Sequence, residues 1–164
     1  MRIKSEKACI EAIRNETCFH AEVADGAFSL KVENYGFFIC TAIHNGHRLR
    51  TDLADRCLLT DKKRLHGENP HTGEFIQAMP IVLAVNDSRY EYDLNRPMEE
   101  CIRETASGNP VWKTALSSAE IKASHEKYLA FYRVLDALVE KVEEKHGACL
   151  LYDVHSYNYK RVND

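Results

Sequence analysis

Two histidines, His44 and His155, each come directly after an apolar run that is typical of a buried strand. Histidine is a common zinc ligand, and a rigid strand end fixes the position of a ligand before the metal binds. Catalytic zinc usually takes three protein ligands, so a third is needed, and His47 and Glu68 are the main candidates, with Glu74 a weaker one. The alternative is that the histidines only form hydrogen bonds at strand ends. The chain contains eight histidines, so two of them can follow strands by coincidence.

A second polar group is the segment Asp93-Leu94-Asn95-Arg96. An arginine can bind a carboxylate through two parallel hydrogen bonds, and the neighbouring asparagine adds a donor. This pair suits a small-molecule substrate with a free carboxylate. The alternative is a structural salt bridge from Arg96 to Asp93 or Glu99.

The elements that must position these residues are strands and one long helix. Strands are expected at residues 28–32, 37–43, 81–85, 90–94 and 148–154, and a helix at 118–146. The first two strands are expected to pair across the turn at 33–36. Ser117 and Glu120 have the spacing of a capping box, and Gly147 is the expected end of the helix.

The order of these elements predicts where the polar groups meet. A long helix between strands indicates an α/β sheet with parallel pairs. In such sheets ligands bind at the carboxyl ends of the strands. We therefore expect His44, the pair Asn95-Arg96, and His155 to surround one crevice.

The composition is that of one ordinary globular domain, residues 1–164, and it excludes several function classes. A net charge of −3 provides no basic surface for nucleic acid or for an anionic membrane. No apolar run is long enough to span a bilayer, and residues 1–13 have no apolar core of a secretion signal, so a cytoplasmic location is expected by default. The six cysteines lack zinc-finger spacing, and we expect them to be reduced and structural.

Four segments together resemble the N-formylglutamate amidohydrolase family. They are Ile43-His44-Asn45-Gly46-His47-Arg48, Arg64-Leu65-His66-Gly67-Glu68-Asn69-Pro70-His71-Thr72-Gly73, Asp93-Leu94-Asn95-Arg96-Pro97 and Tyr152-Asp153-Val154-His155-Ser156-Tyr157-Asn158. The family is similar in fold to zinc carboxypeptidases and aspartoacylase. The resemblance therefore implies an α/β fold with a mixed, mostly parallel sheet flanked by helices, and one Zn²⁺.

The resemblance also implies roles for individual residues. It implies His44 and His155 as zinc ligands, and Asn95 and Arg96 as the residues that bind the substrate carboxylate. It favours Glu68 as the third ligand, because Glu68-Asn69-Pro70 stands where formylglutamate enzymes have Glu-Asp-Pro. His47 remains the alternative, because it stands where carboxypeptidases have a ligating glutamate.

Three further residues are expected around this site. Asp153 lies two residues before His155 on a strand, so both side chains face the same side, where Asp153 can orient the histidine or cap backbone groups. Arg48 and Tyr157 are close in sequence to the candidate ligands and can help to stabilise an oxyanion.

The resemblance implies metal-assisted hydrolysis of the amide of a small N-acyl amino acid such as N-formylglutamate. Enzymes of this fold take the general base, a glutamate, from a strand after the last histidine ligand, so that residue and the end of the sheet are expected beyond residue 164. The chain is then the N-terminal portion of such a domain, or a shortened relative. The alternative function is a non-catalytic domain that binds a metal, a carboxylate or a partner, and an incomplete sheet with an exposed edge strand favours a homo-oligomer.

Overall fold

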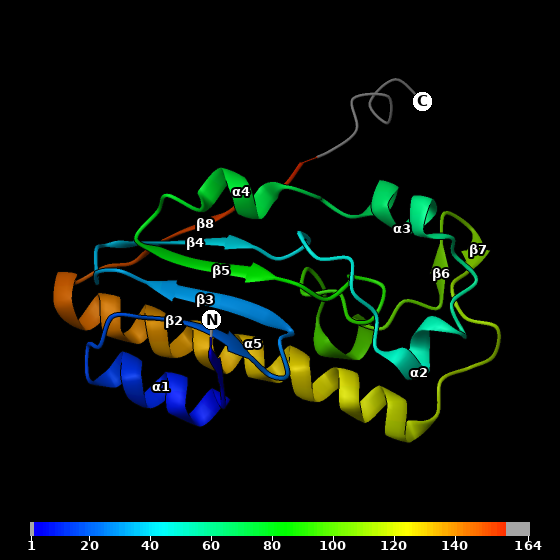
Figure 1. Ribbon diagram of the computed structural model, residues 1–164, viewed down its shortest axis with the longest axis horizontal. Helices are drawn as coiled ribbons and strands as arrows, with labels where there is room; N and C mark the ends of the chain where they lie inside the picture. Colours follow the sequence, from blue (N-terminus) through cyan, green and yellow to red (C-terminus); the bar gives the residue numbers. More distant parts are fainter. Residues whose placement is uncertain (1, 157–164) are drawn as a thin grey trace.

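The protein is built on a mixed six-stranded β-sheet, and the computed structural model describes residues 2–156 (Figure 1). Across the sheet the strands are β1 (Arg2–Lys4), β2 (Phe19–Val23), β3 (Phe28–Val32), β5 (Ile81–Val85), β4 (Phe38–Ala42) and β8 (Leu150–Asp153). Strands β1 and β2, β5 and β4, and β4 and β8 are parallel, whereas β3 is antiparallel to β2 and to β5. The predicted α/β fold with a mixed sheet between helices is confirmed.

Helices cover both faces of this sheet. The two longer ones, α1 (Glu6–Arg14) and α5 (Ser118–His146), lie below it in Figure 1. Above it lies α4 (Thr72–Ile76), which contacts β4 and β5. The remaining elements are α2 (Thr51–Ala54), α3 (Asp61–Gly67), a 3₁₀ turn at Met98–Glu100 and the short hairpin of β6 (Thr105–Ala106) and β7 (Asn109–Pro110). Within residues 2–156, the helices are too short or too polar to span a membrane.

Helix α5 begins and ends where the sequence predicts. Ser117 accepts from the backbone N–H of Glu120, and the Glu120 side chain accepts from Ser117 in return, which completes the capping box. Gly147 has a φ of 77°, the left-handed conformation that ends a helix with little strain when no Cβ is present. The helix therefore has well-defined ends and can act as a rigid support.

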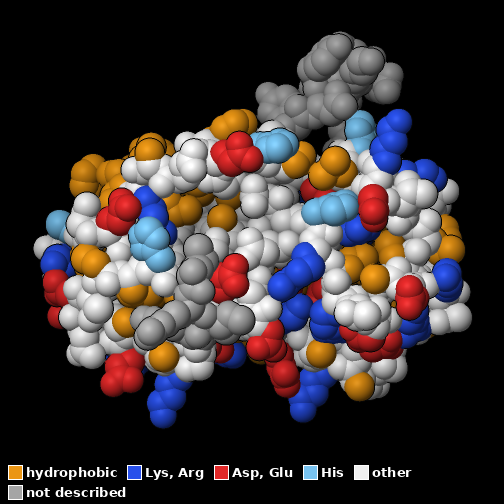
Figure 2. All heavy atoms as spheres, in the orientation of Figure 1, with side chains coloured by type: hydrophobic (Ala, Val, Ile, Leu, Met, Phe, Trp, Pro, Cys, Tyr) orange, Lys and Arg blue, Asp and Glu red, His pale blue; other side chains and the backbone are white. Residues whose placement is uncertain are grey.

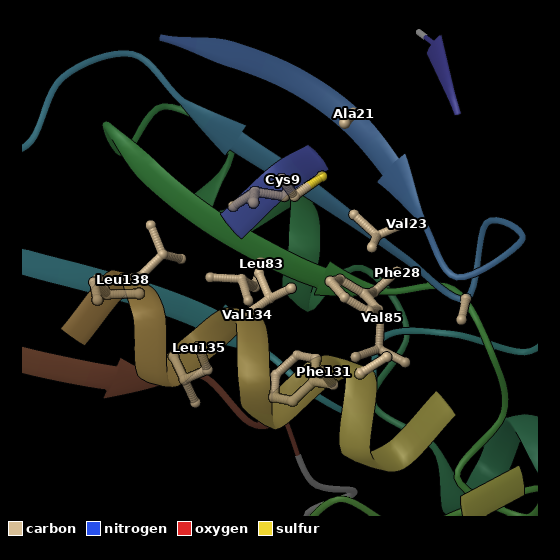
Figure 3. Close-up of a cluster of buried hydrophobic side chains, with 14 of the residues drawn as sticks. Cys9, Ala21, Val23, Phe28, Leu83, Val85, Phe131, Val134, Leu135 and Leu138 are labelled. Carbon is tan, nitrogen blue, oxygen red and sulfur yellow. The ribbon is translucent and has the colours of Figure 1, made fainter. Parts of the chain in front are cut away.

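The main core lies between α5, α1 and the sheet. Figure 3 shows side chains of α5 directed at Leu83, Val85 and Phe28 of the sheet, with Cys9 of α1 on the same side. The rings of Phe28 and Phe131 pack edge to face, 5.4 Å between centroids. This packing fixes β3 and β5 on α5, and so fixes the loop that follows β5.

One predicted strand pairing is wrong. Residues 28–32 and 38–42 are both strands, but they are not neighbours, because β5 lies between them. β5 is Ile-Val-Leu-Ala-Val and is buried along most of its length, so it gains most from a neighbour on each side. The connection at 33–36 therefore spans the width of one strand instead of closing a hairpin.

Two other expectations about strands also need correction. Residues 90–94 form a buried loop without strand pairing. Glu91 and Asp93 alternate with apolar residues as in a half-exposed strand, but both are buried and form ion pairs with Lys127 and Arg89. β8 was expected to be buried, but it lies at the sheet edge with Leu150, Leu151 and Tyr152 about half exposed.

Candidate active site

His44 lies just after β4, and the fold holds it almost completely buried. Its Nε2 is 2.7 Å from Oδ1 of Asp93, which is also fully buried. Within the described part of the chain, no group forms a hydrogen bond with His44 Nδ1, although that atom is buried. A buried polar atom without a partner is costly, so this nitrogen is suited to a ligand.

His155 comes to the same place because β8 runs parallel to β4. Thr41 of β4 pairs in register with Asp153 of β8 and donates a hydrogen bond to its Oδ1 over 2.7 Å. The other oxygen of Asp153 lies 2.7 Å from His155 Nε2. The rings of His44 and His155 then meet edge to face, 5.1 Å between centroids. Each histidine is thus backed by an aspartate, the arrangement that fixes the tautomer of metal-binding histidines.

Glu68 and Asn69 close the site from the loop after α3. The backbone N–H of Asn69 donates to the carbonyl of His44 over 2.9 Å, and its Oδ1 lies 3.1 Å from His155 Nδ1. The Glu68 carboxylate, buried beside them, lies 2.5 Å from His47 Nδ1 through Oε2 and accepts from the Ser88 hydroxyl through Oε1. Glu68 and His47 therefore bind each other here, while Asn69 contacts the histidine pair.

These contacts give a partial fit to the expected zinc site. In the described residues, no three His, Cys, Asp or Glu side chains converge with the geometry of a metal site. The donor chemistry does fit, since His44 offers a buried free nitrogen beside the ring of His155. To hold a metal, His155 must exchange one of its two partners, Asn69 or Asp153, and a third ligand requires Glu68 or His47 to exchange its present partner.

Asp93 is surrounded by positive charge. Its Oδ2 lies 2.6 Å from Arg89 Nη2, 3.7 Å from Arg96 Nε and 3.8 Å from Arg103 Nη1. Burial raises the pKa of Asp93, but the hydrogen bonds from His44 and Arg89 outweigh burial and hold its pKa well below the usual range. The Asp93 carboxylate therefore stays negatively charged, and the three guanidinium groups around it carry more positive charge than it neutralises.

Asn95 and Arg96 both contact Asp93: the backbone N–H of Asn95 donates to Oδ1 over 3.1 Å, and Arg96 Nε lies 3.7 Å from Oδ2. The Arg96 side chain is partly exposed and also lies 3.7 Å from Glu100 Oε2, so the predicted alternative of a salt bridge to Asp93 is present, with Glu100 in place of Glu99. Both residues line a hollow of about 400 Å³, together with Tyr128 and Tyr132 of α5. A carboxylate in this hollow would meet a guanidinium with unused donors.

Comparison with known proteins identifies the family. The family model for N-formylglutamate amidohydrolase matches residues 37–163. The chain belongs to this family. The crystal structure of the gene product Atu2144 from Agrobacterium tumefaciens has a similar fold, with a TM-score of 0.66 and 16% sequence identity. The alignment covers 80% of this chain and 56% of that one, and no curated protein matches.

In this member of the N-formylglutamate amidohydrolase family, sequence reasoning missed a buried charge network next to the site. Lys127 of α5 donates to Asp87 over 2.7 Å and to Glu91 over 2.8 Å. Asp87 also accepts from Arg48 Nε over 2.7 Å. The network joins α5 to the loops after β4 and β5, which carry His44 and Asp93. Lys127 is 40 residues from Asp87, so only the motif Asp87-Ser88-Arg89 after an apolar strand could have indicated it.

The remaining predicted residues lie outside the histidine pair. The hydrogen bonds of Arg48 go to Asp87 and to the carbonyl of Asp25, which directs its side chain toward the β2–β3 turn. Tyr157 lies outside the described residues. Glu74, the weaker ligand candidate, binds His71 at the surface of α4.

Proposed function

We propose that this chain hydrolyses the amide bond of a small N-acyl amino acid with a free carboxylate, that N-formylglutamate is the first substrate to test, and that the reaction depends on Zn²⁺. The observation that carries the proposal is the pair of aspartate-backed histidines at the ends of two parallel strands, next to an arginine hollow. Family membership supports the reaction class.

The roles of the residues follow from their positions. His44 Nδ1 and His155 would hold the zinc, with Glu68 as the third ligand and His47 as its alternative. A zinc ion held there would polarise the carbonyl of the substrate and would lower the pKa of a bound water from 15.7 to about 7. Arg96, with Asn95, would fix the substrate carboxylate and so place the amide beside the histidines.

Asp93 acts as a positioning residue in this proposal. Its lowered pKa and its three arginine neighbours make it a poor proton acceptor near neutral pH. It holds His44 by Nε2, which leaves the buried Nδ1 available to a metal. It also lies between His44 and Arg96, so it links the two halves of the substrate site.

The first experiment measures bound metal and turnover together. Zinc is determined by elemental analysis in the parent protein and in His44→Ala and His155→Ala variants, and His20→Ala serves as the matched control, because His20 is exposed on β2. Near-stoichiometric zinc in the parent and the control, lost in both site variants, together with hydrolysis of N-formylglutamate, is the expected result. A parent protein that binds no zinc after incubation with the metal would overturn the ligand assignment.

One observation favours a second candidate function, a binding domain without catalysis. No three candidate ligands converge in residues 2–156. Calorimetric binding of N-formylglutamate without any turnover in the zinc-loaded protein would favour this alternative. Turnover that is lost in Arg96→Met, with binding weakened in parallel, would exclude it.

A further inference from the structure

Two hollows of unequal size lie near the candidate site, and neither is lined by His44 or His155. The hollow at Asn95 and Arg96 has about 400 Å³. A groove of about 1050 Å³ lies between α3 and the β6–β7 hairpin, which Figure 1 shows at the same end of the molecule. The proposed function assigns a role to the smaller hollow only.

Asn69 connects the groove to the site. It forms part of the groove wall, and it contacts the carbonyl of His44 and the ring of His155 over 2.9 and 3.1 Å. Glu68, the candidate third ligand, lines the same wall. Through Asn69 and Glu68 the groove wall therefore adjoins the candidate metal ligands His44 and His155.

The groove is much larger than a formyl group. A water molecule occupies about 30 Å³ of liquid, so about 1050 Å³ holds on the order of 35 atoms of that size, whereas N-formylglutamate has about 12 non-hydrogen atoms. The proposed function places the carboxylate end of this substrate at Arg96, in the smaller hollow. Pockets of about 300–1000 Å³ are typical of larger ligands.

The walls of the groove are suited to an apolar group. Leu59, Leu65, Pro70, Tyr90 and Ala106 line it, and Leu65 is 45% exposed. Polar side chains, among them Lys62, Lys63 and Asn109, lie between these apolar ones. Figure 2 shows hydrophobic and basic side chains side by side at the right of the molecule, where α3 and the hairpin lie. Burial of an apolar chain in such a groove is favourable by about 25 cal/mol per Å² of apolar surface.

We infer that the groove is an acyl subsite, and that the substrate class is an amino acid with a free carboxylate whose amide nitrogen carries a bulky, partly apolar acyl group. This inference rests on the proposed function, because it assigns the acyl side of the same scissile amide. Water cleaves the C–N bond: its hydroxyl goes to the acyl carbon, which leaves as a carboxylic acid, and its remaining hydrogen goes to the nitrogen of the released amino acid. A fatty acyl chain and a short apolar peptide share this chemistry.

The test compares substrates that differ only in the acyl group. Zinc-loaded protein is assayed with N-formyl-, N-acetyl- and N-octanoyl-L-glutamate, and with the peptide Leu-Leu-Glu. The expected result is a kcat/KM at least about tenfold higher for the octanoyl compound or the peptide than for the formyl compound. The better of these two identifies the source of the acyl group. A kcat/KM that falls steadily as the acyl group grows would overturn the inference.

A blocking variant places the effect in the groove. Asn109 is an exposed groove residue on β7, so Asn109→Trp should fill part of the space without disturbing the core. We expect about a tenfold loss of kcat/KM for the octanoyl substrate and less than about a twofold change for the formyl substrate. Glu104→Trp, an exposed position just before β6 that is not part of the groove wall, is the matched control. Equal losses for both substrates would contradict the subsite.

Direct binding separates this inference from the proposed function. If no amide is hydrolysed, the proposed function fails, and calorimetry with N-octanoyl- and N-formyl-L-glutamate still tests the groove. Tighter binding of the octanoyl compound that Asn109→Trp removes would support the acyl subsite. Equal binding of the two compounds would overturn it.

Discussion

At the scale of residues, Asp93 determines how the candidate site is arranged. It is fully buried, holds His44 at 2.7 Å and has three arginines within 3.8 Å of its other oxygen. An aspartate in this position fixes the histidine tautomer and raises the basicity of the ligand. The Asp93 carboxylate therefore contacts both His44, a proposed metal ligand, and Arg96, the proposed partner of the substrate carboxylate.

Asp93→Asn tests this double role. The amide keeps the shape but loses the charge, so we expect zinc affinity to fall by about 10–100-fold, with a parallel loss of hydrolysis. Zinc affinity is measured by competition with a chromophoric chelator. Asp136→Asn, at an exposed position on α5, is the control and should bind zinc like the parent. Unchanged zinc affinity in Asp93→Asn would exclude its positioning role.

The sequence was sufficient to indicate the histidine pair but not its partners. His44 and His155 follow apolar strands, and parallel neighbours release their ends at the same edge, so their proximity could be inferred. The contact between His44 and Asp93 joins residues 49 apart, and neither is near the other in any local pattern. Such contacts depend on the order of the strands in the sheet, and the hydrophobic pattern of the sequence does not determine this order.

At the scale of elements, the loop after β4 depends on Gly46. A Cβ at this position would lie 2.2 Å from the carbonyl carbon of Asn86, in the loop after β5. The backbone N–H groups of His47 and Arg48 both donate to the carbonyl of Asn86 over 3.1 Å. The close approach of two backbones therefore requires glycine here.

Gly46→Ala should destabilise the protein. The methyl group must displace backbone atoms, and overpacking of this kind costs about 1–3 kcal/mol or more. For a domain of this size each 1 kcal/mol corresponds to a fall in Tm of about 2–4 °C. Thermal unfolding followed by circular dichroism measures the change, and Gly36→Ala is the control, since the nearest atom there belongs to the side chain of Asn34. Equal Tm values for the two variants would show that the loops can separate.

Glu120, in the first turn of α5, makes the stability of the folded protein depend on pH. Hydrogen bonds from Arg56 and then Ser117 lower the pKa of Glu120 from 4.5 to about 2. Because the folded pKa lies below the unfolded value, the stabilisation is complete above about pH 4.5 and is lost as the pH falls toward 2.

Glu120→Gln isolates this charge, since glutamine also completes a capping box. We expect the parent to have the higher urea midpoint at about pH 6, and the difference to shrink toward about pH 2. The carboxyl carbon shift of Glu120 in NMR spectra should titrate with the lowered pKa. A midpoint difference that is independent of pH would assign the effect to the cap alone.

The errors in the strand predictions have a physical cause. Helix α5 could be placed to the residue because its cap and its glycine stop are local signals. The positions of the apolar strands in the sequence were predicted well, but their order in the sheet was not. β5 lies between β3 and β4, where it buries its apolar side chains and pairs on both edges, so β3 and β4 do not pair directly. Pairing order is a property of the whole sheet, so two neighbouring runs in the sequence do not determine it.

At the scale of the whole molecule, the sheet ends in an apolar edge. β8 pairs with β4 on one side, and in the described residues no strand pairs with its other side. Leu150 and Leu151 are 44% and 45% exposed, and Figure 2 shows hydrophobic side chains gathered at the upper left, over the region of β8 and α4. This chain also spans 56% of the structurally similar chain from Agrobacterium tumefaciens. An edge strand without a lysine, proline or bulge is a template for further strand pairing.

The exposed edge predicts that this chain associates with itself through β8. In Leu151→Lys a charge lies on the open edge, and such charges prevent edge-to-edge pairing at little cost to the fold, because the side chain is already half exposed. We expect the molar mass of the parent, measured by light scattering after size exclusion, to rise with concentration, and that of Leu151→Lys to stay at 18.8 kDa. Leu129→Lys, at a 38% exposed position on α5, controls for the added charge and should associate like the parent. If the parent and both variants remain monomeric at every concentration, the β8 edge does not drive association, and Leu150 and Leu151 stay exposed to water in the monomer.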